Sequence, residues 1–339
     1  MTQAANQPST ANEWQRARDT KGVVTITHIG GQALLEGIMM RGRYNWAIAL
    51  RRPDGSIYTE QHELASGQKR FAWMHWPVIR GCTALVESLT LGFQALQLAG
   101  ENALAEEEEE EDEVDEDEDD SIPPALMTVA MVLGIALGML IFVALPAFLT
   151  NLIVGDIGEK TLVWNLVDGV LRICIFLVYI WLVSRLEEIA RMFGYHGAEH
   201  RTIHCYEHGM QLTPENADLF PSLHVRCGTA FMLMTMIIAI VVFTAIPIAS
   251  IITALGVTNR ILRFLLLVAM RIVLIPLIAG LAYEVTVKWA GSRPENPLVR
   301  FVLWPGMQLQ RLTTNKPDRG QLECAIAAMQ LVLDREARE

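Results

Sequence analysis

The sequence predicts a mainly α membrane protein: about four transmembrane helices in two hairpins, a small N-terminal β-rich cytoplasmic layer, and amphipathic helices. Three observations lead to this prediction. Hydrophobic residues make up 52% of the 339 residues. They gather in four long blocks, and only short connections join the blocks of each pair. A helix needs about 20 apolar residues to cross the hydrocarbon core of a bilayer, and each block is longer than that.

The four blocks form two predicted transmembrane hairpins, at residues 125–184 and 229–287. The first and third blocks contain no charged residue. The second contains Asp168 and Arg172, and the fourth contains Arg263, Arg271 and Glu284. Charged side chains are costly inside a bilayer, so we expect them to face the bundle interior or water. The blocks run from Ala125 to Leu149, from about Leu162 to Ser184, from Thr229 to about Leu255, and from Ile261 to about Val287.

The placement of lysine and arginine predicts the orientation of these helices. Basic residues are frequent before residue 125, after residue 287 and in the histidine-rich segment 185–228, whereas the hairpin loops offer only Lys160 and Arg260. By the positive-inside rule, both termini and the histidine-rich segment are cytoplasmic. We therefore expect a multi-pass protein of the bacterial plasma (inner) membrane. A reducing cytoplasm suits the five cysteines, which show no disulfide spacing.

The acidic excess of the chain is local. The net charge is −11, but residues Glu106 to Asp120 hold 14 carboxylates in 15 positions, and without them 24 acidic side chains face 27 basic ones. Such a run repels itself and cannot bury apolar surface. We predict a disordered acidic linker at residues 105–122 and a disordered polar tail at residues 1–21.

Residues 22–70 are predicted to be a β-rich cytoplasmic segment. Asn45–Arg52 and Ser56–Glu63 flank a Pro-Asp-Gly sequence, and alternating residues around such a turn indicate a hairpin. Val23–Ile29 is a candidate for a further strand. The glycines within residues 30–37 suggest tight turns.

Two other segments are predicted to be amphipathic. In residues 71–104, apolar side chains recur at helical spacing behind two tryptophans, which indicates an interfacial helix lying on the membrane. A fifth span is the alternative, but it would place the histidine-rich segment outside the cell. In the C-terminal segment 288–339, Asp318 and Gln321 have the spacing of a helix capping box.

Four of the eight histidines recur every four residues, which places them along one face of a helix. The first two belong to an H-x-x-E-H sequence, a pattern in which two histidines bind zinc and the glutamate activates water. We therefore predict a divalent metal, zinc first, with His196 and His200 as ligands and Glu199 as general base. The other two histidines of the row are His204 and His208, and the further candidate ligands are His224, Glu207, Cys227 and Glu284.

Three interpretations of this pattern remain open. In the first, the metal is catalytic and keeps an open coordination position. In the second, His196, His200, His224 and Cys227 form a closed structural zinc site. In the third, no metal binds and the histidines are a polar helix face near the membrane.

The remaining signals are weaker. Arg172 and Arg271 are expected to form a network with Asp168, and contact with an anionic substrate is the alternative. Motifs for nucleotide binding and for serine hydrolases are absent from the sequence, and there is no basic stripe that would indicate a nucleic-acid partner.

Several sequence motifs together resemble the uncharacterised bacterial YqhQ-like membrane proteins, over residues 22 to 335. These motifs are Gly30-Gly31-Gln32-Ala33, Glu36-Gly37, Met39-Met40-Arg41, His196 to His200, Tyr206-Glu207-His208-Gly209, Arg226-Cys227-Gly228-Thr229 and Pro305-Gly306 to Thr314. The resemblance implies a domain of unknown function described as a predicted metal-dependent enzyme. It also implies that His204 is a position where the family accepts other residues, which counts against His204 as a ligand.

Our leading hypothesis is a metal-dependent hydrolase whose site lies at the cytoplasmic face and whose substrate is a lipid-like molecule or a membrane protein. The alternative is a non-catalytic scaffold or assembly factor for membrane proteins, with a structural zinc or no metal. A third hypothesis, an oligomeric transporter, rests on the charges within the spans. The partners expected are the lipid bilayer and a second copy of the chain.

Overall fold

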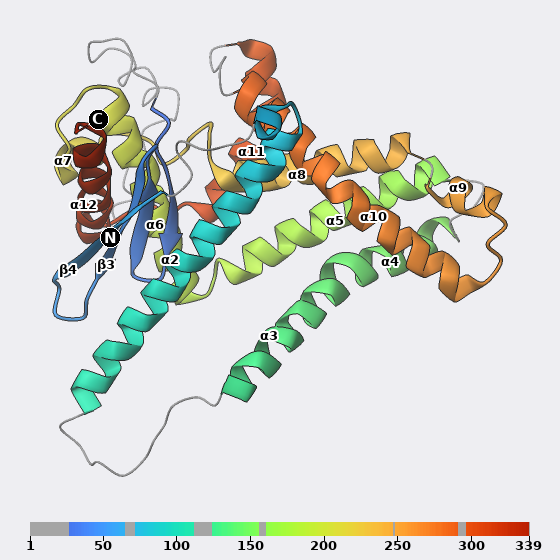
Figure 1. Cartoon of the computed structure of the whole chain (residues 1–339), viewed down its shortest axis with the longest axis horizontal. Coiled ribbons are helices and arrows are strands. Elements are labelled where there is room, and N and C mark those ends of the chain that lie inside the picture. Colours follow the sequence, from blue (N-terminus) through green and yellow to red (C-terminus); the bar gives the residue numbers. More distant parts are fainter. Residues whose placement is uncertain are drawn as a thin grey trace, which may run out of the picture.

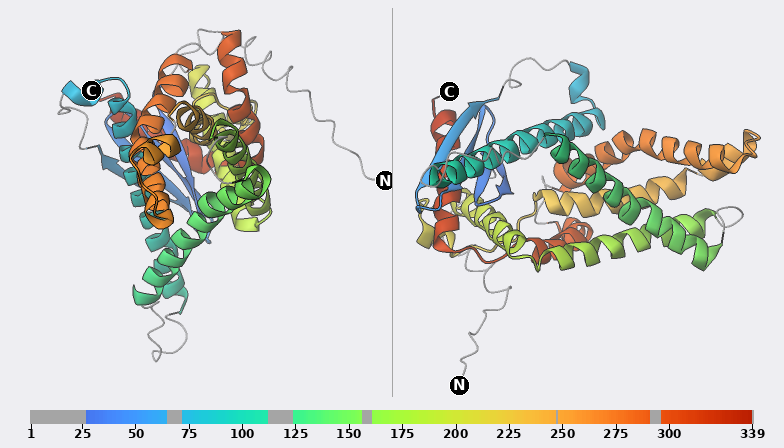
Figure 2. Two further views of the ribbon diagram at one scale, coloured as in Figure 1. Left: turned by 90° about the vertical axis from the view of Figure 1, so that its right-hand side faces the viewer. Right: turned by 90° about the horizontal axis from the view of Figure 1, so that it is seen from below.

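The computed structural model of the chain describes residues 27–64, 72–111, 124–155, 161–246, 248–290 and 296–338. A small antiparallel sheet with its covering helices lies at one end of the molecule, and long helices extend from it toward the other end (Figures 1 and 2). The structure is mainly helical with a small N-terminal sheet, which confirms the predicted fold class.

The sheet is a meander of four strands in chain order. They are β1 (Gly30–Leu34), β2 (Gly37–Arg41), β3 (Asn45–Arg51) and β4 (Ile57–Glu63). The hairpin predicted around the Pro-Asp-Gly turn is β3 and β4, in which Arg51 pairs with Ile57 and Gly55 has a φ of +84°.

One expectation for the start of the sheet was wrong, and another is tested only in part. The glycines within residues 30–37 were expected in tight turns, yet they lie at the starts of β1 and β2, and the chain turns at Leu35 and Glu36 instead. Residues 23–26 of the predicted strand Val23–Ile29 lie outside the described residues, and residues 27–29 precede β1 without strand structure.

Helices cover both faces of the sheet. Ile38 and Met40 of β2 pack in a buried cluster with side chains of α6 (Glu187–Glu207) and α12 (Arg319–Glu336). Met39, between them in the strand, packs on the other face against Leu91 of α2 (Ile79–Glu111). This period of two fixes the register of β2, because a slip by one residue would reverse both faces.

The long helix α2 corrects part of the predicted linker. It continues to Glu111, so the first part of the acidic run is helical rather than disordered, in keeping with the good helix propensity of glutamate. Residues 112–122 lie outside the described residues. The packing of Leu91, Ala95 and Ala99 against the sheet excludes this part of α2 from a bilayer core, which contradicts the alternative of a fifth span.

The described residues contain four helical stretches long and apolar enough to cross a membrane. They are Val132–Val154, Leu162–Val183, Gly228–Ala245 and Leu265–Ala290. The helices that build them are α3 (Pro124–Met139), η2 (Leu140–Ala144), α4 (Leu145–Val154), α5 (Thr161–Val183), α8 (Gly228–Ala245), α10 (Arg260–Tyr283) and η3 (Glu284–Ala290). The third block is shorter than predicted, because α8 ends at Ala245 and a separate helix, α9 (Ile248–Ala254), follows.

Helix α11 (Pro297–Thr313) connects the spans to the sheet unit. Its Leu309 is buried with Phe176 of α5 and Leu233 of α8. The chain then passes into α12, where Asp318 and Gln321 form the predicted capping box. A short helix, α7 (Pro214–Ala217), and a 3-10 turn, η1 (Ala72–His75), complete the described elements.

Candidate metal centre

Helix α6 carries the histidine-rich pattern into the interior of the protein. Two of its glycines allow this close packing. A Cβ at Gly197 would lie 2.1 Å from the Asn315 carbonyl oxygen, and one at Gly194 would lie 2.4 Å from the Gln321 side chain. His196, His200 and His204 are buried, whereas the third interpretation made this row of histidines a polar face near the membrane.

Three side chains converge where α6 meets the start of α8. His196, His200 and Cys227 each offer a ligand atom, and these atoms all lie within 4.8 Å of one another. His196 Nε2 is 3.2 Å from Cys227 Sγ. Cys227 is the N-cap residue of α8, so the helix dipole adds to the stabilisation of a thiolate there.

Backbone carbonyls orient both imidazole rings. His196 Nδ1 donates to the Thr313 carbonyl at 2.7 Å, and His200 Nδ1 donates to the Ser222 carbonyl at 2.5 Å. A carbonyl can only accept, so these bonds place a proton on each Nδ1 and direct each Nε2 toward the cluster. A metal-binding histidine is commonly oriented in this way, by a hydrogen bond from its second ring nitrogen to a backbone carbonyl.

His200 Nε2 provides a direct test of whether a cation fits. This nitrogen is buried and has no hydrogen-bond partner among the described residues. Leaving a buried polar atom unsatisfied costs about 1–3 kcal/mol. A metal ion bound between the two imidazoles and the thiol would satisfy it, and nitrogen and sulfur donors are the set that zinc prefers.

The pKa values of His196 and Cys227 indicate that a positive charge is favoured between these two side chains. Burial favours the neutral ring of His196, but the charge and the hydrogen bond of Cys227 outweigh it and raise the pKa of His196 to about 9. Burial likewise opposes the thiolate, yet the charges of His196 and His200 hold the pKa of Cys227 well below its ordinary value. Without a metal, a proton supplies the positive charge between these two side chains.

Glu199 lies beside the three candidate ligands. Its side chain is buried, and Oε1 accepts a hydrogen bond of 2.9 Å from the Gly31 amide of β1. Burial raises the pKa of Glu199, although the charges of His200 and His196 oppose the rise. Gly31 is required at this approach, because a Cβ there would lie 3.0 Å from the Glu199 carboxyl carbon and 2.7 Å from the Met39 carbonyl oxygen.

A second group of candidate ligands, His204, Glu207 and His224, also meets within 4.8 Å. Here the protein supplies its own cation. The Arg226 guanidinium donates to Glu207 Oε1 and to the Thr27 carbonyl, and it lies 3.4 Å from His224 Nε2. The second group is therefore an internal ion-pair network, and the first group is the better metal site.

The charges of this network keep the carboxyl of Glu207 ionised. Burial acts to raise the pKa of Glu207, but the interaction with His224, the Arg226 charge and the Thr27 amide together lower it to about 2. Gln310 holds His224 in place, because its side chain accepts from the His224 amide and donates to the His224 carbonyl, each at 2.8 Å.

The structure brings together some of the predicted site residues and separates others. His196, His200 and Cys227 lie in one cluster, and the carboxyl of Glu199 is close enough for their charges to act on its pKa. Glu207 and His224 belong to the neighbouring network. Glu284 belongs to neither group, and its carboxylate accepts from the Arg80 guanidinium and from the Val78 amide.

The sequence reasoning missed the groups that orient the ligands. The carbonyls of Ser222 and Thr313 and the Gly31 amide are backbone atoms, for which no residue type gives a signal. Arg226 belongs to the motif Arg226-Cys227-Gly228-Thr229, which marks it as a residue of interest. Nothing in the sequence indicated that it would bind Glu207.

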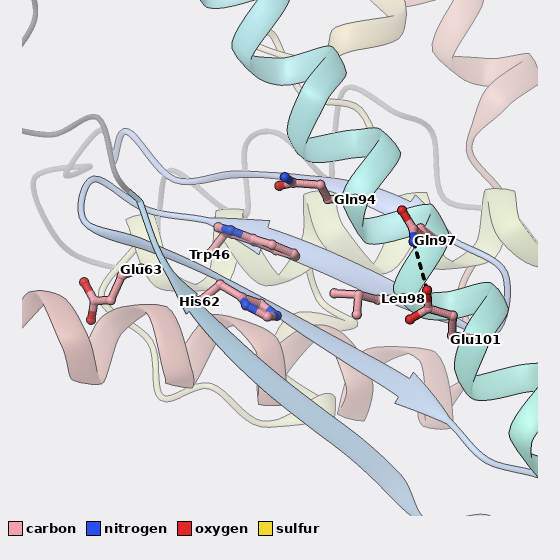
Figure 3. A pocket seen from close by; sticks show the side chains of 7 residues that line it. All are labelled: Trp46, His62, Glu63, Gln94, Gln97, Leu98 and Glu101. Atoms are coloured by element: carbon pink, nitrogen blue, oxygen red, sulfur yellow. Dashed lines mark hydrogen bonds between the residues drawn. The ribbon is translucent and has the colours of Figure 1, made fainter.

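A separate surface pocket of about 390 Å³ lies between the sheet and α2. Trp46 and His62 stack at 4.4 Å along one wall, and Gln94, Gln97 and Glu101 of α2 form the other (Figure 3). Since α6 packs on the opposite face of the sheet, this pocket is not part of the metal cluster.

Comparisons with known proteins extend over most of the chain. Residues 76–335 match a family described as "Protein of unknown function (DUF1385)". The chain is also similar to the "Uncharacterized protein YqhQ" of Bacillus subtilis (strain 168), with 30% identity over 310 residues, which cover 91% of this chain and 93% of that protein. No solved structure matches.

Proposed function

The chain belongs to the family of unknown function DUF1385, and we propose that it is a metal-dependent hydrolase acting at the cytoplasmic interface of the membrane. One observation carries this proposal. The two histidines whose Nδ1 atoms are bound to carbonyls direct their Nε2 atoms at Cys227 Sγ, beside the buried carboxyl of Glu199.

His196, His200 and Cys227 would hold the ion, and three protein ligands leave a fourth position open, as in catalytic zinc sites. When bound, a divalent ion supplies Lewis acidity and makes a water molecule in that position easier to deprotonate. Glu199 would accept the proton. Its raised pKa and its bond to the Gly31 amide suit a general base that is held in one orientation.

The position of the cluster in the fold supports the choice of substrate class. Cys227 precedes the first residue of α8, a candidate span, and Thr313 ends α11, which packs against two spans. The cluster therefore lies at the end of the bundle that faces the sheet unit. With the orientation given by the positive-inside rule, a lipid headgroup, an isoprenoid phosphate or a membrane-embedded peptide would reach it from the cytoplasmic surface.

Metal content tests the first part of the proposal. Protein purified in detergent without chelators should contain about one zinc per chain by elemental mass spectrometry, as expected for one three-ligand site. The double variant His196→Ala/His200→Ala should contain none. His208→Ala is the matched control, because His208 is the C-cap residue of the same helix and lies outside both ligand groups. Wild type without stoichiometric metal would overturn the proposal.

Turnover tests the second part. Wild-type protein incubated with bacterial lipid extracts should release water-soluble headgroups or inorganic phosphate, and Glu199→Gln should abolish the release while the metal stays bound. Equal release by both proteins would remove Glu199 as the general base.

A structural zinc site is the second candidate, and one observation favours it. All three ligands are buried, with exposed fractions of 9% for His196, 1% for His200 and 7% for Cys227. In that case the metal would only hold α6 and the start of α8 together, and the protein would act as a scaffold. Azide added to the cobalt-substituted protein separates the two, because its visible spectrum should change only if a coordination position is open.

A further inference from the structure

Three charged side chains meet inside the candidate spans, at a distance from the metal centre. Arg172 Nε is 2.9 Å from Asp168 Oδ2, one turn away on α5. Arg271 of α10 approaches the same oxygen, with Nη1 at 3.7 Å. The Asp168 side chain is only 4% exposed. This group of charges confirms the network predicted from the sequence, but it contains two cations and one anion.

Arg172 is satisfied by its surroundings. Besides Asp168, its Nη1 donates to the Phe142 carbonyl at 3.1 Å. Phe142 lies in the π-helical turn η2, and Pro146, four residues later, has no N–H to donate to its carbonyl. Arg172 therefore has partners for its charge and for its donors: the Asp168 carboxylate and the Phe142 carbonyl of the first candidate span.

Arg271 is not satisfied in the same way. Its guanidinium carries five N–H donors, yet among the described residues it makes the single ion pair with Asp168 and no hydrogen bond within 3.5 Å. Its other neighbours are two aromatic faces, Trp164 at 5.6 Å and Phe243 at 5.1 Å. The side chain remains 20% exposed, so the donors can be reached.

Asp168 can neutralise only one of the two guanidinium groups, so the cluster keeps one positive charge within a candidate span. An uncompensated charge in a low-dielectric region is costly, and arginine forms its strongest hydrogen bonds with carboxylate and phosphate oxygens. We infer that Arg271 binds an anionic group, a phosphate or a carboxylate, in a site walled by Trp164 and Phe243.

The site lies on the side of the membrane away from the metal centre. Phe243 is near the end of α8, sixteen residues after Cys227, which is about 24 Å along the helix axis. Trp164 is the fourth residue of α5 and marks the same end of the bundle. The anion comes from that side, as a lipid headgroup of that leaflet or as a soluble anion. The inference does not depend on the proposed hydrolase.

Thermal unfolding in lipid nanodiscs tests the site. Wild-type protein is compared in phosphatidylcholine, in phosphatidylcholine with added phosphatidylglycerol, and in phosphatidylcholine with inorganic phosphate. A higher unfolding temperature in the second condition identifies a lipid source, and one in the third identifies a soluble anion. Arg271→Gln should lose this increase, whereas Arg300→Gln, which removes an exposed charge on α11, should keep it.

Two results would overturn the inference. One is a wild type that unfolds at one temperature in all three conditions. The other is an Arg271→Gln variant that keeps the wild-type increase, including one that is destabilised equally in every condition. Equal destabilisation would make Arg271 a structural partner of Asp168 only. If Arg271→Gln does not fold, Arg271→Lys keeps the charge and loses the planar fork. It should then need a roughly tenfold higher fraction of phosphatidylglycerol for half of the increase.

Discussion

At the scale of single residues, the hydrogen bond of one histidine ring nitrogen determines which role the other nitrogen can take. His196 and His200 each donate a hydrogen bond from Nδ1 to a backbone carbonyl, so that the Nε2 atoms of both rings lie near Cys227. His224 differs, because Arg226 approaches its ring and binds its carboxylate neighbour Glu207. The same residue type therefore serves a candidate ligand set in one place and an ion-pair network about one helical turn away.

Glu207 gives a pH-dependent prediction. Its pKa falls from an ordinary value near 4.5 to about 2 in the folded protein, so its contribution to stability is complete above the ordinary value and is lost as the pH falls toward 2. The difference in unfolding free energy between wild type and Glu207→Gln should therefore shrink over that interval. Denaturant unfolding in detergent at pH 7, 5 and 3.5 measures it. Glu188→Gln, exposed on the same helix, should show no comparable change.

Arg226 should be the more sensitive member of this network. Arg226→Gln would leave Glu207 buried beside a neutral side chain, which typically costs about 3–5 kcal/mol of stability. An unfolding free energy within about 0.5 kcal/mol of wild type, the range of an ordinary surface substitution, would show that the pair has no structural importance.

At the scale of elements, the position of α6 depends on its glycines. Gly197→Ala would place a methyl group against the Asn315 carbonyl, two residues from the carbonyl that orients His196. We expect a loss of about 1–3 kcal/mol, as for other overpacked sites, and weaker zinc binding by competition with a chelator. Gly100→Ala on α2 is the control, because a Cβ there has no neighbour within 4 Å and the substitution should be neutral or stabilising.

The elements also show what a sequence can and cannot predict. The β3–β4 hairpin and the capped start of α12 follow from local chemistry, a Pro-Asp-Gly turn and an Asp-x-x-Gln box. β1 and β2 were missed because glycines that allow close packing look like turn residues in the sequence, and the strand register depends on α2, α6 and α12, which lie far away in the chain. The histidine spacing predicted the helix and the two histidines that meet Cys227, but not the carbonyls that orient them.

At the scale of the whole molecule, the sheet unit and the candidate spans both contribute residues to the candidate metal centre. β1 contributes the amide that binds Glu199, α6 contributes the histidines, and α8 and α11 contribute Cys227 and the Thr313 carbonyl. A second connection is the ion pair between Arg80 of α2 and Glu284, near the end of the fourth candidate span. A shift between the sheet unit and the bundle would therefore change the geometry of the cluster.

The proposed cytoplasmic substrate requires one orientation of the bundle. The positive-inside rule predicts that alkaline phosphatase fused after Gly256, between α9 and α10, is active in bacterial cells, whereas the same enzyme fused at the C-terminus is inactive. Green fluorescent protein at the C-terminus should be fluorescent. The reverse pattern would place the candidate metal centre outside the cytoplasm and would require a different class of substrate.

X-ray absorption at the zinc edge shows whether His196, His200 and Cys227 bind one metal ion together. If they do, the zinc should have a shell of two imidazole nitrogens and one oxygen near 2.0–2.1 Å with one sulfur near 2.3 Å. In Cys227→Ser the sulfur should disappear, whereas Cys205→Ser, at a buried cysteine outside the cluster, should leave it unchanged. A wild-type shell without sulfur, or with sulfur that persists in Cys227→Ser, would contradict the proposed centre.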